Sequence, residues 1–222
     1  MPQRTGIRYH ELVGPEGATQ PGSRGRVLAN LLGIKSKRAM DLAEYMALLA
    51  AQEQVATTLT AETRFTAELL RAMHRDWLGG LYAWAGRYRT IELQKGSFAW
   101  PPADRVAENM TVFERQVLSR LTPCRPGLLE QVAESVAAVH ADLLLIHPFR
   151  DGNGRLARWL ADLMFAQADF PVPDYGFVGR GNALRRETYL RAVTQGYLQN
   201  YGLLGSFFVA AVRRREGGEP LR

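Results

Sequence analysis

A short run in the second half of the chain carries several groups that could act together in one reaction. His147 titrates near neutral pH and can accept a proton from a hydroxyl, and Asp151 offers the hard oxygen ligand that Mg²⁺ prefers. Arg155 and Arg158 lie three residues apart, so on a helix they share a face and can bind more than one phosphate. The run therefore predicts a nucleotide-phosphate site with a metal ion and a general base.

The residues between these groups predict a tight loop followed by a helix. Pro148 ends an incoming apolar helix, because the residue before a proline is pushed away from helical geometry. Gly152 and Gly154 permit positive φ and let a ligand approach the backbone closely. The next helix is expected to begin near Asn153, so its unpaired N–H groups and positive dipole end would face the loop and favour an anion such as phosphate.

Each of these residues also has a purely structural explanation. Gly-Asn-Gly is a common turn, and a histidine before a proline is often only the end of a helix. The combination favours chemistry over this explanation, because a module that only binds nucleotide needs neither His147 nor Asp151. Such a non-enzymatic interaction module stays open as an alternative.

The run resembles the signature of the Fic family, His-Pro-Phe-x-(Asp/Glu)-Gly-Asn-Gly-Arg-x-x-Arg, and no position of it departs from that pattern. The resemblance implies a protein adenylyltransferase that moves AMP from ATP to a Ser, Thr or Tyr hydroxyl of a target protein. It makes His147 the catalytic base, Asp151 the Mg²⁺ ligand and Phe149 an anchor of the loop in the core. The predicted nucleotide-binding residues are Gly152, Asn153, Gly154, Arg155 and Arg158. Transfer of UMP, or a kinase-like transfer of phosphate, stays open.

A second block resembles the same family between His74 and Gly86, where the chain reads His followed by Tyr-x-Trp-Ala-Gly. His74 is interpreted as a structural residue that is hydrogen-bonded in or near the core. After this block, alternating apolar and polar residues around Lys95-Gly96 predict a short β-hairpin within residues 89–100. The resemblance implies that this hairpin is a flap that docks an extended segment of the target. Its residues are Ile91, Glu92, Leu93, Gln94, Lys95, Gly96, Ser97 and Phe98.

Apolar periodicity predicts helices along most of the remaining chain. The fold class is therefore all-α, a Fic-fold helical bundle with one small β-hairpin flap. We expect Ala50, Val117 and Leu128 among the residues that face the core. The predicted helices span residues 36–56, from 60 to the block at 74, 103–120, 127–146, the stretch after the motif, 182–196 and 199–213. The domain prediction is a mobile N-terminal arm over 1–25, a single Fic domain over 26–213 and a disordered tail over 214–222.

Two further features have competing interpretations. His140 lies two turns before His147 on nearly the same helix face, which suggests a metal site, but no third ligand has suitable spacing, so a structural histidine is favoured. Tyr189 and Gln195 are weak candidates for an adenine pocket, because the family places residues of this region near the base. Packing is the competing explanation for both.

Composition limits the compartment and the partners. The 222 residues are 46% hydrophobic and 23% charged, which is ordinary for a globular protein. Cys124 is the single cysteine and cannot form an internal disulfide, so a reducing cytoplasm is predicted. No apolar run is long enough to span a membrane, and no membrane partner is expected. The net charge of +6 is spread without an aromatic-interleaved basic face, so nucleic acid is not the expected partner.

Many Fic proteins inhibit themselves through a Ser/Thr-x-x-x-Glu-Gly/Asn helix whose glutamate pairs with the second motif arginine. Glu-Gly or Glu-Asn occurs at Glu16, Glu108 and Glu216, but none has Ser or Thr four residues earlier. The resemblance therefore implies a bacterial toxin whose inhibitory glutamate comes from a separate small antitoxin and pairs with Arg158. Its target protein presents an acceptor hydroxyl, and the ATPase subunits of type II topoisomerases are candidates.

Overall fold

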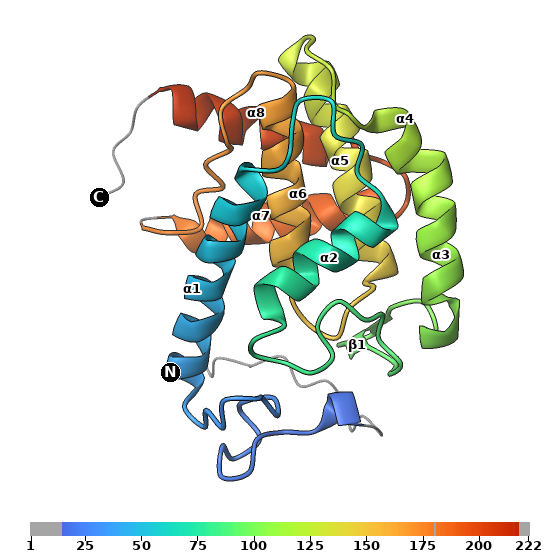
Figure 1. Cartoon of the computed structure of the whole chain (residues 1–222). Helices are drawn as coiled ribbons and strands as arrows, with labels where there is room; N and C mark the ends of the chain where they lie inside the picture. The colour runs from blue at the N-terminus through green and yellow to red at the C-terminus, as the bar shows by residue number, and fades with distance from the viewer. Residues whose placement is uncertain (1–14, 180, 218–222) are drawn as a thin grey trace. The chain divides into compact units, whose positions relative to one another are not determined.

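The computed structural model describes residues 15–179 and 181–217 and is mostly helical (Figure 1). One β-hairpin is present in this part of the chain. The all-α fold class with a small hairpin is therefore confirmed. The elements, in chain order, are α1 (Lys37–Ala56), α2 (Ala67–Leu78), β1 (Gln94–Lys95), β2 (Phe98–Ala99), α3 (Val106–Phe113), α4 (Ser119–Leu121), α5 (Leu129–Ile146), α6 (Asn153–Gln167), α7 (Asn182–Gly196) and α8 (Gly202–Glu216).

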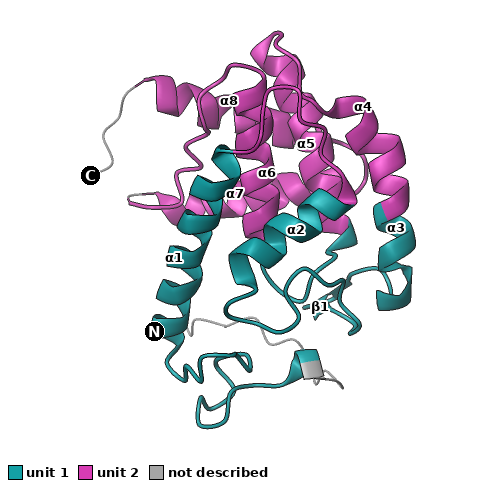
Figure 2. Cartoon of the chain, viewed as in Figure 1, with its two compact units in different colours: residues 1–57, 68–110, 146–153 teal, residues 58–67, 111–145, 154–222 magenta. Residues whose placement is uncertain are grey.

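The chain divides into two compact units (Figure 2). Unit 1 contains residues 1–57, 68–110 and 146–153, so it holds α1, most of α2, the hairpin and the loop at 147–152. Unit 2 contains residues 58–67, 111–145 and 154–222, with α5, α7, α8 and nearly all of α6.

Helix α1 begins as the sequence predicts. The Ser36 hydroxyl accepts a hydrogen bond from the Ala39 backbone N–H, which satisfies one of the free donors of the first turn. Met40 and Val55 lie on the buried face, but Ala50 is exposed, so its predicted inward position is wrong. Glu44 occupies part of the buried face instead.

The second helix starts later than its apolar pattern suggests, at Ala67 rather than near Thr60. The Thr60 N–H donates to the Thr63 hydroxyl at 2.9 Å, and the Thr63 N–H donates to the Thr60 carbonyl at 3.0 Å. Threonine side chains thereby close a turn in place of the first helical turn. Gln167 also donates to the carbonyls of Thr60 and Thr63, which holds this turn within unit 2.

A π-helical turn explains one wrong core prediction. The helix predicted over residues 103–120 contains a π-turn at Glu114–Leu118 between α3 and α4. The wider turn inserts about one extra residue. Leu118 is therefore fully buried where the regular period placed Val117, which is only half-buried.

Unit 2 has a core of apolar and aromatic side chains from α5, α6 and α8. Val136, Leu160 and Phe208 are fully buried. Leu128, expected in this core, is 66% exposed because α5 begins one residue after it. Helices α5 and α7 approach closely at Gly196, where an added Cβ would lie 2.6 Å from Cβ of Ala141.

The remaining boundaries agree with the sequence in part. Helix α7 spans the predicted residues, whereas α8 covers 202–216 instead of 199–213. Gln199 has a φ of 61°, and the Asn200 N–H donates to the Gln195 carbonyl, a helix-ending turn that delays the start of α8. Residues 1–14 of the predicted arm and 218–222 of the predicted tail lie outside the described residues.

None of the helices in the described ranges combines the length and the hydropathy needed to cross a membrane.

Candidate active site

The loop at 147–152 joins the end of α5 to the start of α6, as the sequence predicts. Its first residue, His147, has a φ of 51°, in the left-handed region that non-glycine residues rarely adopt. Strain of this kind persists only where the surroundings enforce it, and it is common at functional sites. The contacts that enforce it come from unit 1.

Arg89 binds the backbone of the strained residue, His147. This arginine is 2% exposed, and its Nε donates to the His147 carbonyl at 2.8 Å. Its backbone N–H donates to the Pro148 carbonyl at 2.8 Å. The guanidinium also donates to the carbonyls of Ile91 and Pro101, at 2.9 and 2.6 Å, so one side chain ties the loop to both ends of the hairpin segment. Burial lowers the pKa of Arg89, while the nearby Glu92 and Glu16 carboxylates raise it.

Asn153 closes the loop from the other end. Its side-chain oxygen accepts from the Phe149 N–H at 2.9 Å, and its side-chain amide donates to the Phe149 carbonyl at 2.7 Å. Asn153 is 2% exposed, so these two bonds satisfy its buried polar atoms. The asparagine thus fixes the loop backbone at the first residue of α6.

His74 supports the middle of the loop. It is fully buried, as the sequence interpretation expected, and its ring stacks on Phe149 with centroids 3.9 Å apart. Nδ1 accepts from the Gly86 N–H at 2.9 Å. The proton must therefore lie on Nε2, which donates to the Asp151 carbonyl at 3.0 Å. Phe149 is fully buried in this arrangement.

Gly152 is required at its position for two reasons. Its φ is 84°, which L side chains avoid, and an added Cβ would lie 2.9 Å from Cζ3 of Trp77 and 3.3 Å from Nε2 of His74. Its N–H donates to the Asp151 carboxylate at 2.6 Å. The loop backbone therefore packs directly against buried rings, with no room for a side chain.

Glu16, in the N-terminal region, also contacts the loop, and the sequence did not predict this contact. The buried Arg150 donates from Nε to the Glu16 carbonyl at 2.9 Å. The Glu16 carboxylate in turn accepts from the Thr90 N–H at 3.1 Å. Glu16 is therefore a structural brace between the loop and the segment that leads into the hairpin.

The hairpin lies beside the loop within unit 1. Gln94 pairs with Ala99 and Lys95 with Phe98, and Gly96 has a φ of 59° in the turn, so the predicted hairpin is confirmed. Ile91 and Leu93 are buried at its base, whereas residues 94–99 are exposed. The Trp100 ring lies 4.1 Å from the His147 ring between centroids, at an interplanar angle of 34°. The histidine ring is thus placed by the residue that follows β2.

Helix α6 carries the arginines of the motif. Arg155 and Arg158 lie in its first two turns and are half-buried. Within unit 2, the Arg158 guanidinium lies 5.5 Å from the centroid of the Phe177 ring, which is cation–π geometry. Arg186 lies over the same ring at 4.8 Å. The Phe177 ring therefore contacts two guanidinium groups, those of Arg158 and Arg186.

Buried polar groups of unit 2 surround Arg158. The Nδ1–H of His140 donates to the Ala157 carbonyl at 3.0 Å, and its Nε2 accepts from the Tyr189 hydroxyl at 2.7 Å. Burial, aided by the charge of Arg158, lowers the pKa of His140 to about 3. Both ring nitrogens are thus engaged in hydrogen bonds by a neutral ring, which supports the structural interpretation of His140. Tyr189 is likewise buried and directed at His140.

Asp162 is the second titratable group near Arg158. The Tyr175 hydroxyl donates to its carboxylate at 2.6 Å. Burial raises the pKa of Asp162 to about 7, although the Tyr175 hydrogen bond and the Arg158 charge act in the opposite direction. A carboxyl that titrates near neutral pH therefore lies one helical turn from a predicted phosphate ligand.

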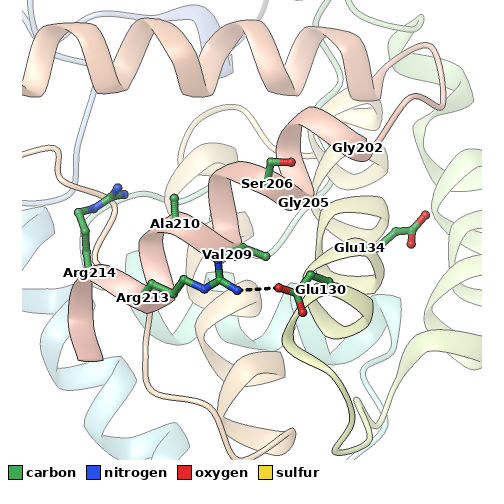
Figure 3. Close-up of a pocket in the computed structure, with 9 residues that line it drawn as sticks. All are labelled: Glu130, Glu134, Gly202, Gly205, Ser206, Val209, Ala210, Arg213 and Arg214. Atoms are coloured by element: carbon green, nitrogen blue, oxygen red, sulfur yellow. Dashed lines mark hydrogen bonds and ion pairs between the residues drawn. The ribbon is translucent and has the colours of Figure 1, made fainter. Parts of the chain in front are cut away.

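An open groove of about 910 Å³ lies in unit 2 between α5 and α8 (Figure 3). Its lining includes Glu130 and Glu134 from α5 and Ser206 from α8, and Arg213 donates to Glu130 across it at 2.7 Å. No residue of the run 147–158 lines it. This groove does not belong to the candidate site.

Exposure separates the residues of the run by kind. His147, Asp151, Arg155 and Arg158 are half-buried and reach solvent, whereas Phe149 and six other residues are buried. Those six are Pro148, Arg150, Gly152, Asn153, Leu156 and Ala157. The groups that could do chemistry are accessible, and the groups that shape the backbone are not.

The sequence missed three supports of this loop, Arg89, Glu16 and Trp100. An isolated arginine or tryptophan in a mixed segment carries no signal that distinguishes a buried contact from a surface position. Trp100, the last residue of the stretch predicted to form the hairpin, was the one available hint, because a hairpin that acts as a flap must end near the loop. The sequence also gave no sign of Asp162 or Phe177 as neighbours of Arg158.

Comparison with known proteins agrees with the resemblance of the run to the Fic family. The Fic/DOC family model matches residues 64–165. The chain is 30% identical over 159 residues to "Protein adenylyltransferase Fic" from Nematostella vectensis, covering 70% of this chain and 36% of that protein. It is 24% identical over 181 residues to "Protein adenylyltransferase VbhT" from Bartonella schoenbuchensis, covering 81% and 36%. The chain thus spans about a third of the length of these curated relatives.

Solved structures agree on the fold. The N-terminal Fic domain of a Bartonella effector protein from Bartonella sp. AR 15-3 matches with a TM-score of 0.72 at 19% identity, covering 97% of this chain and 98% of that one. BepC from Bartonella tribocorum, solved with bound AMPPNP, matches with a TM-score of 0.66 at 19% identity, covering 83% and 91%. These similarities show the shared fold.

Proposed function

The chain belongs to the Fic/DOC family, and from this membership we propose that it is a protein adenylyltransferase that moves AMP from ATP to a Ser, Thr or Tyr hydroxyl of a target protein. Two relatives that bear the name protein adenylyltransferase support this activity. ATP as the substrate is supported by these names and by the AMPPNP bound in BepC. We propose a single Fic domain over residues 26–213 as the unit that carries it.

One observation carries the proposal. The complete run from His147 to Arg158 keeps its reactive groups accessible, while Arg89, His74 and Asn153 hold the loop backbone rigid. Positioning and charge stabilisation supply most of the rate in phosphoryl-type transfer. A rigid loop with accessible polar groups is the arrangement that such catalysis requires.

The reaction assigns one role to each group. His147 takes the proton from the acceptor hydroxyl as the hydroxyl oxygen attacks the α-phosphorus of ATP. A new oxygen–phosphorus bond forms, the bond between the α-phosphorus and its bridging oxygen breaks, and pyrophosphate leaves. The backbone amides from Gly152 to Gly154 and the positive end of α6 stabilise phosphate charge. Arg155 and Arg158 neutralise the β- and γ-phosphates, so that pyrophosphate can depart.

Asp151 is the residue that would hold Mg²⁺. Its carboxylate is half-buried at the loop surface, which suits a hard cation that keeps its other ligands from water and phosphate oxygens. No group of three or more His, Cys, Asp or Glu side chains that could hold a metal by themselves occurs in residues 15–179 and 181–217. Asp151 would therefore be the one carboxylate ligand of the ion, and the nucleotide phosphates would provide further oxygen ligands. When bound, the ion would supply positive charge that stabilises the charge of the phosphates.

The hairpin is proposed as the flap that docks the target. Its exposed strands are short, and an extended segment could add to an edge by backbone hydrogen bonds. The contact between Trp100 and His147 would then bring a docked hydroxyl towards the base. The flap thereby couples target recognition to the catalytic histidine.

We further propose that the chain is a bacterial toxin, active in the cytoplasm and restrained by a separate antitoxin. The sequence lacks the internal inhibitory motif, and the Glu16 carboxylate, one of three candidates, is bound to the Thr90 N–H. A glutamate from a small partner would pair with Arg158 and block the γ-phosphate subsite. Topoisomerase ATPase subunits stay candidate targets.

Label transfer tests the activity directly. The purified chain is incubated with Mg²⁺, α-labelled ATP and a bacterial lysate, beside a His147→Ala control. Label on a lysate protein that is absent from the control supports AMP transfer and gives the mass of the target. Label from α-labelled UTP would indicate that UMP is transferred instead of AMP. Label from γ-labelled ATP alone would indicate a kinase-like reaction. No label under any of these conditions, with ATP still bound, favours a non-enzymatic nucleotide-binding module.

A further inference from the structure

Helix α1 has an apolar face that packs into unit 1. Met40, Ala51 and Val55 are buried along it. Between them, the Glu44 carboxylate accepts from the Tyr82 hydroxyl at 2.6 Å, and the Glu44 carbonyl accepts from Nε1 of Trp77 at 2.9 Å. These contacts fix which face of α1 points into the unit.

The opposite face of the same helix is also apolar, and it is exposed. Leu42, Tyr45, Met46 and Leu49 are 59%, 55%, 55% and 41% exposed. Their spacing follows the i, i+3, i+4, i+7 rule for one helix face. At about 100° per residue, the centre of this stripe lies roughly opposite the centre of the buried face. Scattered exposed apolar residues need no explanation, but a contiguous stripe marks an interaction surface.

The charges that bound this stripe are self-complementary. Arg38 precedes the stripe and Glu53 follows it, both exposed and both on the same helix face. Neither forms an ion pair within the described ranges, whereas Lys37, which precedes Arg38, pairs with Asp41 on the same helix. The basic end of the stripe is therefore complementary to the acidic end of an identical stripe that runs the other way.

The pattern is symmetric about a point midway between Tyr45 and Met46. In an antiparallel pair of α1 helices centred there, Leu42 would face Leu49 of the second copy, and Tyr45 would face Met46. The same register would place Arg38 opposite Glu53 at both ends. A two-fold contact requires a surface that is complementary to itself. This stripe meets the requirement, because apolar residues face apolar residues and basic residues face acidic ones.

We propose that the exposed face of α1 is the contact surface of a homodimer, in which two copies of this chain pack their α1 helices antiparallel with Arg38 of each opposite Glu53 of the other. One helix from each copy buries less area than a stable obligate dimer needs, so the association is weak and reversible. The dissociation constant is expected in the micromolar range.

Sedimentation velocity of the purified full chain from low to high micromolar concentration tests this proposal. The expected mass rises from the monomer value of 24.8 kDa towards twice that value. Leu42→Glu and Tyr45→Glu should each abolish the rise, and glutamate keeps the helix intact because it is a good helix former. Leu184→Glu on α7 is the matched control, because Leu184 is 69% exposed and lies outside the stripe.

Charge reversal tests the register. Arg38→Glu or Glu53→Arg alone should weaken the dimer about tenfold, because each reversal creates two like-charge pairs. The double variant Arg38→Glu/Glu53→Arg should return the affinity to within about threefold of the parent, since both pairs are restored in reverse. A chain that stays monomeric at high micromolar concentration overturns the proposal and leaves the stripe to a different partner. A double variant no tighter than the single variants also overturns it, because the antiparallel pairing is then wrong.

Discussion

At the scale of single residues, His147 combines a strained backbone with an accessible ring. The Arg89 hydrogen bond to its carbonyl and the Trp100 ring beside its imidazole hold this geometry. In the proposed reaction the imidazole takes a proton, and proton transfer of this kind is worth about 10²- to 10⁴-fold in rate. We therefore expect His147→Ala to reduce label transfer by about that factor.

The same substitution should leave ATP binding within about twofold of the parent, because the phosphate-binding groups lie elsewhere in the run. Isothermal titration with ATP and Mg²⁺ checks this control. Full transfer activity in His147→Ala would show that this histidine is not the base. Lost ATP affinity would show that it binds nucleotide rather than moving a proton.

Gly152 is a position where shape alone decides. Gly152→Ala forces an L side chain to a φ of 84° and brings its Cβ within 2.9 Å of the buried Trp77 ring. Such strain and overpacking typically destabilise by about 1–3 kcal/mol each. Thermal unfolding should show a clearly lower Tm.

Gly154→Ala is the matched control for stability. Gly154 has no positive φ, and the nearest atom to an added Cβ is Nη1 of Arg158 at 3.6 Å. Because alanine is favoured over glycine in a helix by up to about 1 kcal/mol, this variant should be equal to or more stable than the parent. Equal Tm losses for the two variants would contradict the packing argument.

Asp162 predicts a pH dependence of folding. Its pKa is about 7 in the folded chain and near 3.8 without burial, so the folded state binds the proton more tightly. Stability from this group is present below about pH 4 and is lost as the pH rises through about 7. Asp162→Asn should therefore raise the free energy of unfolding at pH 8, by on the order of 1–3 kcal/mol, and have little effect at pH 4.

Chemical denaturation at both pH values measures this difference. The carbonyl of the substituted amide can still accept from Tyr175, so the comparison isolates the charge. A loss of stability at pH 8 would mean that ionised Asp162 is stabilised by Arg158 more than it is penalised by burial.

At the scale of elements, the proposed docking role of the hairpin depends on which of its backbone groups point outward. Lys95 and Phe98 close the turn, and the Trp100 N–H donates to the Leu93 carbonyl at 3.0 Å. In an antiparallel pair, hydrogen-bonded and non-hydrogen-bonded positions alternate, so the backbone groups of Gln94 and Ala99 point away from the hairpin. Each would pair with an added strand on its own edge.

Gln94→Pro and Ala99→Pro each remove one outward N–H while sparing the hairpin bonds, because proline is tolerated at edge positions. One of them should raise the KM for the target at least about tenfold, since a docking backbone bond is lost at that edge. The KM for ATP should not change. The edge whose variant has no effect is the internal control, and two ineffective variants would rule out docking by strand addition.

Arg89 shows how one side chain couples two elements. It binds carbonyls of the loop and of the residues at both ends of the hairpin segment. A displaced hairpin therefore cannot leave the His147 backbone unchanged without breaking buried hydrogen bonds. If a target docks on the hairpin as proposed, this coupling connects docking to the geometry of His147, the proposed base.

At the scale of the whole molecule, activity depends on whether the chain inhibits itself. Autoinhibition would require a glutamate of this chain to block the nucleotide site. Glu16, Glu108 and Glu216 follow the acidic half of the inhibitory motif but lack the residue that begins it. The purified chain should therefore transfer label without any activating substitution.

Glu16→Gly, Glu108→Gly and Glu216→Gly test this expectation in the same assay. None should raise the transfer rate by more than about twofold, and Glu16→Gly should lower stability because its carboxylate binds the Thr90 N–H. An increase of about tenfold or more in any variant would identify an internal inhibitor.

Local features could be predicted without the structure. Ser36 begins α1, Pro148 and Gly152 shape the loop, and Lys95-Gly96 forms the hairpin turn, because each depends on the conformational limits of one or two residues. The identity of the run 147–158 was also readable, since its residue types and spacing are rare in combination. Helix periods gave the all-α class.

Tertiary structure decided what depends on distant neighbours. Thr60 forms a turn rather than a helix start, and Gln167, far along the chain, donates to the carbonyls of Thr60 and Thr63 in that turn. A π-turn places Leu118 in the core instead of Val117. Arg89 is buried only because four carbonyls converge on its guanidinium. Its burial, like the pKa of Asp162, is set by desolvation and by partners that no local pattern reveals.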